Sequence, residues 1–258
     1  MKKLAFMFIA LVAILSVSAC RIEKVNNNEP AKSFTLNFKD FQSIKNFSNC
    51  DIHFTQSNTY KVVLKATPQW YDAHTITANN GELVITEKEE KKQKGITVLK
   101  FNYISSGAEL WISAPNISSV AMGGSGDFYA ESDISGQYFH LSIAGSGDSR
   151  LKNIRLTDDF SYSVSGSGDV ETGIILAKNA SFSISGSGDI KSKLANVENT
   201  KLTIAGSGDG SLSFDQCGSA VIGIAGSGDI NLSGTLQSLD KRVSGSGDIN
   251  TSKLQLGK

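Results

Sequence analysis

Seven copies of the tetrapeptide Gly-Ser-Gly-Asp are the residues of this chain whose types could do chemistry. Glycine-rich turns can hold phosphate, a serine between glycines can be a nucleophile, and repeated aspartates can bind Ca²⁺. The copies begin at Gly124, Gly145, Gly166, Gly186, Gly206, Gly226 and Gly245. Because a catalytic loop is needed only once, the repetition indicates a structural role.

The spacing within each copy argues against nucleotide binding and against a serine nucleophile. A phosphate-binding loop needs a lysine after its glycines and a helix behind it, and neither follows these copies. A nucleophilic serine needs Gly-x-Ser-x-Gly and a histidine partner. The three histidines, His53, His74 and His140, are scattered, and His140 falls on the outward side of its expected strand. We therefore expect no catalytic residue and no cofactor.

Calcium is the more serious alternative for the aspartates. Repeats that bind Ca²⁺ between coils have a period of about nine residues, whereas these copies recur every 19 to 21 residues. In register, the aspartates would form a ladder of carboxylates about 5 Å apart that repel one another. Backbone amides or cations could offset the repulsion. We expect no metal site, and the sequence leaves open whether the ladder binds cations.

The segments before each copy alternate between apolar and polar residues. Pairs such as Ile143 and Leu141, or Ile184 and Phe182, lie two and four residues before the first glycine. A period of two is typical of a half-buried strand. Each unit is therefore strand, corner, strand and loop, and stacked units would bury a continuous apolar face. The sequence predicts an all-β fold, a parallel β-helix or solenoid with coils of about 20 residues.

Within each corner, the glycines permit backbone angles that a side chain forbids, and the aspartate can bond nearby backbone amides. The structural turn residues are Gly124, Gly126, Asp127, Gly145, Gly147, Asp148, Gly166, Gly168, Asp169, Gly186, Gly188, Asp189, Gly206, Gly208, Asp209, Gly226, Gly228, Asp229, Gly245, Gly247 and Asp248. The alternative is a set of antiparallel hairpins that form a sandwich or propeller blades. Lys241, at an apolar slot of the last unit, indicates a cap against further strand addition.

The chain divides into four parts. Lys2 and Lys3, a short apolar run and Val17-Ser18-Ala19-Cys20 predict a signal peptide over 1–19, with a lipobox that would leave Cys20 as the lipidated first residue. Residues 20–33 would be a tether and 34–123 an irregular β region. Residues 124–258 would form the solenoid.

The irregular region also alternates between apolar and polar residues, in segments such as "SFTLNFKDF", "ELVITEKE" and "GITVLKFNYI". These segments are separated by Asn79-Asn80-Gly81 and by a charged run, 87–94, which is expected to be a solvated loop.

Cys50 and Cys217 are expected in strands, either as buried thiols or as a disulfide. Acidic and basic residues balance at 25 each, so no net charge favours nucleic acid.

The order of these features resembles a known family, the putative auto-transporter adhesin, head GIN domain family of bacterial envelope lipoproteins. The matching segments are "FKDFQSIKNFSNCDIHFTQSNTYKVVLKA", "NNGELVITE" and "AELWISAPNISSVAMGGSGD" with the later copies of the turn. The resemblance implies a β-helical fold and an exported location, and it carries no catalytic residue.

Taken together, these features predict a lipoprotein of the cell envelope, expected at the outer membrane, that acts as an adhesin-like binding or scaffold protein. Its expected partners are the membrane, through the lipid, a glycan or protein ligand, and further copies of the chain. The alternative is a polysaccharide-active β-helix enzyme that uses clustered carboxylates.

Overall fold

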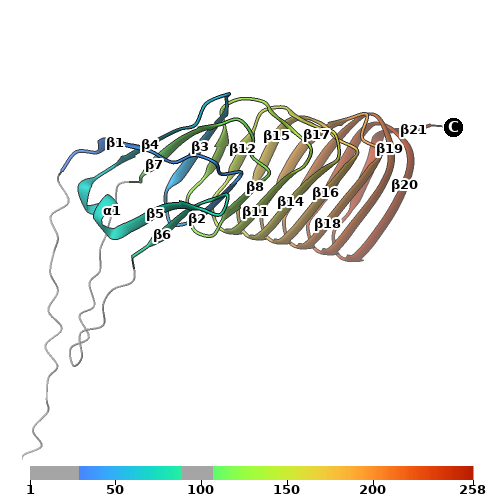
Figure 1. Cartoon of the computed structure of the whole chain (residues 1–258). Helices are drawn as coiled ribbons and strands as arrows, with labels where there is room; N and C mark the ends of the chain where they lie inside the picture. Colours follow the sequence, from blue (N-terminus) through green and yellow to red (C-terminus); the bar gives the residue numbers. More distant parts are fainter. Residues whose placement is uncertain (1–28, 89–106, 258) are drawn as a thin grey trace, which may run out of the picture.

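The chain folds into a β-solenoid that continues into a less regular β region at one end (Figure 1). The computed structural model describes residues 29–88 and 107–257, so Cys20, the signal peptide, the predicted strand 95–104 and most of the charged run lie outside the described residues. The predicted fold class and coil length are confirmed. The hairpin alternative is wrong for the repeat, because successive coils pair in parallel.

The strands are linked by pairing into one continuous sheet that winds around the core, and the Gly-Ser-Gly-Asp corners join two of its faces along one edge. We call the strands before the corners the leading sheet and those after the corners the trailing sheet. In spatial order, the leading sheet consists of β5 (His74–Asn79), β6 (Glu82–Glu87), β2 (Ser43–Phe47), β8 (Ser119–Met122), β11 (Phe139–Gly145), β14 (Asp159–Gly166), β16 (Asn179–Gly186), β18 (Asn199–Gly206) and the second halves of β19 (Gly210–Gly226) and β20 (Ile230–Gly245).

The trailing sheet is ordered in the same way. It consists of β1 (Lys32–Leu36), β4 (Lys61–Ala66), β7 (Glu109–Ala114), β3 (Asp51–Gln56), β9 (Phe128–Ala130), β12 (Ser149–Leu151), β15 (Val170–Leu176), β17 (Ile190–Ala195), the first halves of β19 and β20, and β21 (Ile249–Leu256). Short strands β10 (Ile134–Gly136) and β13 (Ile154–Leu156) pair in parallel on a third side of the stack.

The core lies between the two sheets, and the alternating residues point into it as predicted. Leu141, Tyr162, Phe182, Leu202 and Ile222 occupy one register position in five successive coils, and all are buried. Burial of one large apolar side chain contributes about 1.5–3 kcal/mol. Because each coil adds to the same apolar column, the coils stabilise one another rather than folding separately.

At the N-terminal end, spatial order departs from chain order. The β2–β3 coil lies between the β6–β7 layer and the β8–β9 coil, with parallel pairing on both sides. The strands β5, β4 and β1 then pair antiparallel and end the stack (Figure 1). The β5–β6 hairpin turns at Asn80 and Gly81, which both have positive φ, as the Asn-Asn-Gly signal predicts.

A short helix, α1 (Pro68–Ala73), was not predicted from the sequence. Pro68 lies in its first turn, and the Thr67 side chain accepts a hydrogen bond from the Trp70 backbone N–H at 3.2 Å. These are ordinary signals of a helix start. In the sequence, the alternation of apolar and polar residues on both sides of this segment indicates strands, so these helix-start signals were not recognised. Within the described residues, no helix has the length and apolar character needed to cross a membrane.

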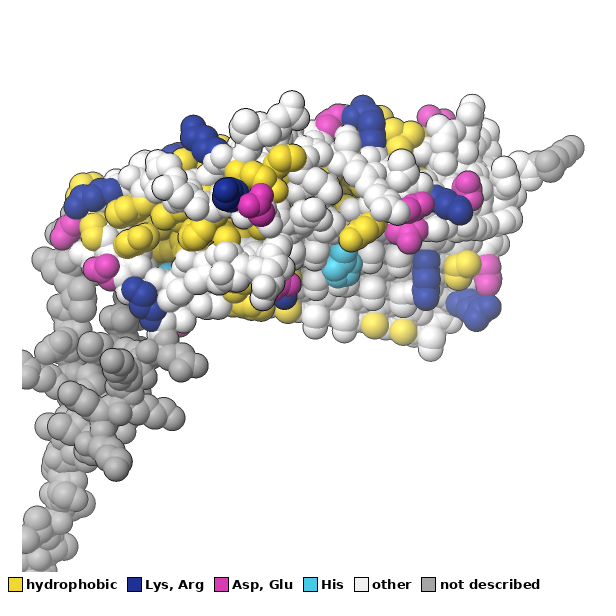
Figure 2. Space-filling view, viewed as in Figure 1, with side chains coloured by type: hydrophobic (Ala, Val, Ile, Leu, Met, Phe, Trp, Pro, Cys, Tyr) yellow, Lys and Arg dark blue, Asp and Glu magenta, His cyan; other side chains and the backbone are white. Residues whose placement is uncertain are grey.

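The two ends of the stack differ in surface character. Figure 2 shows apolar side chains gathered over the N-terminal region, at the left, whereas the stack presents mostly backbone and uncharged side chains of other types, with scattered charges. At the other end, Lys241 pairs in register with the buried Ile222, yet Lys241 itself is exposed. The last coil thus presents a lysine where its predecessors present a core residue.

Candidate functional site

The corners form one straight edge along the stack, and the aspartates connect them. Each corner aspartate donates its backbone N–H to Oδ1 of the aspartate in the coil before it, over 2.7 to 3.0 Å. The ladder begins at Asp51 and continues through Asp127, Asp148, Asp169, Asp189, Asp209, Asp229 and Asp248. The carboxylate therefore bonds the amide of the next coil rather than an amide of its own turn.

The corner glycines allow successive coils to approach this closely. A Cβ built on Gly206 would lie 2.0 Å from the carbonyl oxygen of Gly186, and one on Gly208 would lie 2.0 Å from that of Gly188. Gly206 also has φ of +143°, whereas Gly208 does not lie in the left-handed region. From the third copy onward, the first glycine is thus needed for its backbone angle and its clearance. Gly124, Gly145 and the second glycine of each copy are needed for clearance alone.

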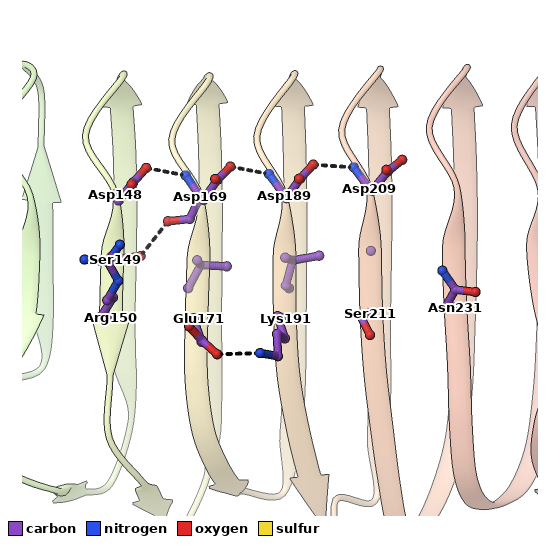
Figure 3. Close-up of a pocket in the computed structure, with 13 residues that line it drawn as sticks. Asp148, Ser149, Arg150, Asp169, Glu171, Asp189, Lys191, Asp209, Ser211 and Asn231 are labelled. Carbon is purple, nitrogen blue, oxygen red and sulfur yellow. Dashed lines mark hydrogen bonds and ion pairs between the residues drawn. The ribbon is translucent and has the colours of Figure 1, made fainter.

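Next to the ladder runs a second line of side chains that the sequence analysis missed. These residues lie two positions after each corner aspartate, point outward from the trailing sheet, and are paired in register. We call them the outer row: His53, Tyr129, Arg150, Glu171, Lys191, Ser211, Asn231 and Asn250, with Trp111 beside His53 at the N-terminal end. Figure 3 shows its middle part below the ladder.

The aromatic end of the outer row is a continuous stack. The indole of Trp111 lies 4.0 Å from the imidazole of His53, with their planes 4° apart, and His53 lies 4.8 Å from the ring of Tyr129. The guanidinium of Arg150 follows at 5.9 Å from Tyr129. Stacked rings and a terminal cation attract one another, so these side chains are held in place before any ligand arrives.

Hydrogen bonds fix the polar atoms of this aromatic stack. Trp111 Nε1 donates to Glu109 at 2.9 Å, and this bond lowers the pKa of Glu109. The Tyr129 hydroxyl donates to Asp127 at 2.7 Å, and this bond, with burial, raises the pKa of Tyr129 to about 12. The phenol therefore stays protonated at neutral pH. His53 Nδ1 lies 2.7 Å from Glu131.

A shallow groove of about 350 Å³ follows the charged part of the outer row. Its walls come from the ladder and the row: Asp148, Ser149, Arg150, Asp169, Val170, Glu171, Asp189, Ile190, Lys191, Asp209, Gly210, Ser211 and Asn231. Lys191 and Glu171 form an ion pair of 2.7 Å across two coils, which lowers the pKa of Glu171 (Figure 3). In the described part of the chain, no residue donates to Oδ2 of the four groove aspartates, so these oxygens remain acceptors.

The other candidate residues are placed as follows. Cys50 and Cys217 are buried free thiols, so the disulfide alternative is wrong, and burial raises the pKa of both. His140 is exposed, and His74 is buried against Trp70. Within 29–88 and 107–257, no group of three or more His, Cys, Asp or Glu is arranged to hold a metal ion.

Comparison with known proteins places the chain among adhesin-like proteins. The family model for the putative auto-transporter adhesin, head GIN domain matches residues 40–216 and again 180–258. The chain belongs to this family. The family description points to a surface or envelope location. Among curated proteins, no similar sequence was found.

Solved structures share the fold at low sequence identity. A putative adhesin from Bacteroides fragilis has a TM-score of 0.73 and 17% identity over 87% of this chain and 98% of that chain. A protein from Parabacteroides distasonis, described as a putative lipid binding protein, has a TM-score of 0.61 and 22% identity over 87% and 97%. A putative adhesin from Parabacteroides merdae has a TM-score of 0.61 and 20% identity over 87% and 97%. At these identities, the similarity extends to the fold alone.

Proposed function

We propose that this chain is a lipid-anchored, adhesin-like binding protein of the bacterial envelope, without catalytic activity, and that the outer row is its ligand-binding surface. One observation carries this proposal. The corner glycines and aspartates repeat from coil to coil, while the position two residues after the aspartate changes from aromatic to charged to amide. Because the corner residues that hold the coils together stay constant, the residues of the outer row can vary and are free to contact a ligand.

The groove fits an extended glycan better than a peptide. Its strands are paired on both sides, so no backbone edge is free to add a peptide strand there. Its apolar residues, Val170 and Ile190, are buried, so it offers no outward apolar pockets for peptide side chains. The ladder carboxylates instead provide a line of acceptors for hydroxyl groups. Strands recur about every 4.8 Å, close to the length of one hexose unit in an extended chain.

The charge of this groove selects against an acidic ligand over the ladder. Four aspartates and Glu171 outnumber Arg150 and Lys191 along its walls. Desolvating an anion next to carboxylates is unfavourable. The sugars that lie over the ladder are therefore neutral in this proposal. The same open, polar groove does not favour a lipid tail, which needs an enclosed apolar cavity.

A polysaccharide-active enzyme is the less favoured function. A glycosidase needs two carboxyl groups in different environments, one of which stays protonated as the acid. The groove aspartates instead have the same bonding in every coil, and the ion pair with Lys191 holds Glu171 ionised.

The binding surface is tested with a soluble variant that lacks 1–19 and carries Cys20→Ser. Immobilised neutral oligosaccharides from envelope and host glycans should retain this protein without being cleaved. The double substitution Arg150→Ala and Lys191→Ala should weaken retention by about tenfold or more, because it removes two donors from the groove. Lys178→Ala with Lys201→Ala, two exposed lysines outside the groove, is the matched control. Cleavage of a glycan would instead establish the enzyme.

The lipid anchor is tested separately in the full chain. Cys20→Ser should abolish acyl labelling and release the protein from the membrane fraction. Persistent labelling would rule out Cys20 as the anchor, and fractionation of inner and outer membranes would locate the labelled protein.

A further inference from the structure

A hollow of about 360 Å³ lies on the trailing sheet at the aromatic end of the outer row. We call it the Trp111 hollow, and its lining residues are His53, Thr55, Lys61, Val63, Lys65, Trp111, Ile112 and Ser113. They come from three neighbouring strands, β3, β7 and β4, whose hydrogen-bonded pairing holds them in register. The hollow is thus built on sheet rather than on loops, and it lies in line with the ladder groove.

The indole of Trp111 forms one wall of this hollow. His53 covers one face of the ring at 4.0 Å, and Val63, directly opposite Trp111 on β4, lies toward the other. The bond from Nε1 to Glu109 holds the ring in its plane. Trp111 remains 36% exposed, although large aromatic side chains usually bury more of their surface. Because neighbouring side chains lie over its faces, the exposed part of this fixed indole is its edge, which offers an apolar contact to a sugar ring.

The charge of the hollow is opposite to that of the groove. Lys61 and Lys65 belong to its lining, and none of its lining residues is acidic. Lys65 pairs with Glu109 at 3.2 Å and lies 4.6 Å above the indole. Lys61 is exposed at the rim and has no ion pair with any residue in 29–88 or 107–257. An exposed lysine without an ion pair at the rim favours a ligand that carries an anionic group.

We infer that the Trp111 hollow binds a single acidic sugar, whose ring lies against Trp111 and whose anionic group pairs with Lys61. Thr55 and Ser113 present hydroxyl groups on the floor of the hollow for the hydroxyls of the sugar. Neutral sugars of the same chain then extend along the outer row over the ladder. The inference rests on the proposed function, and it adds the charge pattern of the ligand: acidic at one end, neutral along the rest.

The test uses the soluble variant and three probes of equal length: a neutral oligosaccharide, the same chain with one terminal uronic acid, and the same chain with one terminal sulfated sugar. Binding is followed by intrinsic fluorescence and by titration calorimetry. The chain has two tryptophans, of which Trp70 is fully buried, so a ligand-dependent change reports on Trp111. One terminal acidic group should tighten binding by about tenfold. The uronic and sulfated probes distinguish a carboxylate from a sulfate.

Variants locate the effect. Lys61→Glu should abolish the advantage of the acidic probes and should weaken their binding more than that of the neutral probe, because only the acidic probes pair with this charge. Trp111→Ala should weaken all three probes, with circular dichroism as the check that the fold is kept. Lys201→Glu, an exposed lysine on the leading sheet, is the matched control and should change nothing.

The outcomes separate this inference from the proposed function. Equal binding of neutral and acidic probes, or an unchanged acidic advantage in Lys61→Glu, would overturn the acidic site and leave the glycan groove standing. Absence of binding to every probe would overturn both. Binding of inorganic phosphate or of vesicles with anionic headgroups, with the same dependence on Lys61 but none on Trp111, would contradict a sugar ligand.

Discussion

At the scale of single residues, glycine recurs at the corners because each coil must lie close to the backbone of the coil before it. The first corner, at 48–51, has Ser48 and Cys50 where later corners have glycine. The later glycines face a corner carbonyl in the preceding coil, whereas no such corner lies behind Ser48 and Cys50 among the described residues. Asp51 is nevertheless the first member of the ladder. This role of Asp51 could not be predicted from the sequence, because the corner reads Ser-Asn-Cys-Asp rather than Gly-Ser-Gly-Asp.

Gly206 and Gly223 should differ in how much an added Cβ destabilises the fold. Gly206→Ala should lower the free energy of unfolding by about 2–4 kcal/mol, because its Cβ meets a backbone oxygen and its φ is unfavourable for a side chain. Gly223→Ala, where a Cβ meets nothing within 4 Å, should change it by less than about 1 kcal/mol. Urea unfolding of both variants makes the comparison. Similar midpoints for the two would contradict the corner geometry.

The ladder predicts that the aspartate acts as an acceptor rather than as a charge. Asp189→Ala should cost about 1 kcal/mol, because the Asp209 amide loses its partner at 2.7 Å. Asp189→Asn keeps a side-chain oxygen and removes one like charge from the ladder, so its cost should be smaller. Thermal melts at low and high salt measure both. An asparagine variant that is less stable than the alanine variant would show that the charge itself is required.

At the scale of elements, the sequence predicts the coils well and their order at the N-terminal end poorly. Alternation within one strand, as in Leu141 and Ile143, is a local signal, and the repeat spacing places each corner. The insertion of β2–β3 between β6–β7 and β8–β9 depends on pairing between distant segments, which no local pattern encodes. Trp111 could not be assigned to the outer row for the same reason. From Tyr129 to Asn250, the row residues occupy the variable position two residues after each repeated aspartate, a signal that the sequence analysis did not use. His53 lacks this signal because its corner departs from the repeat.

The last coil carries a prediction about capping. Lys241→Ile would extend the apolar column of Ile222 to the open end of the stack, where the second half of β20 has no further partner strand among the described residues. We expect this variant to associate end to end, because an uncharged open edge accepts another strand. Light scattering over a concentration series measures the association. Lys201→Ile, in the middle of the leading sheet, is the control for added hydrophobicity, and equal association of both variants would contradict a cap.

At the scale of the whole molecule, the solenoid holds unlike side chains in one straight line. From Trp111 to Asn231, the outer row crosses seven strand spacings, or roughly 34 Å at about 4.8 Å each. The cationic Trp111 hollow lies at one end, and the carboxylate ladder follows the rest. The spacing of the repeat predicts the rod from the sequence. The separation of the cationic hollow from the carboxylate ladder could not be predicted, because it depends on which strands are neighbours.

The most direct test of this account is the dependence of affinity on ligand length, measured by titration calorimetry with the soluble variant. The ligands are neutral oligosaccharides that carry one terminal acidic sugar and differ in the number of neutral units. We predict that affinity rises with each added unit until the chain spans the outer row, and then levels off. Affinity that is the same for the shortest and the longest ligand would contradict binding along the row.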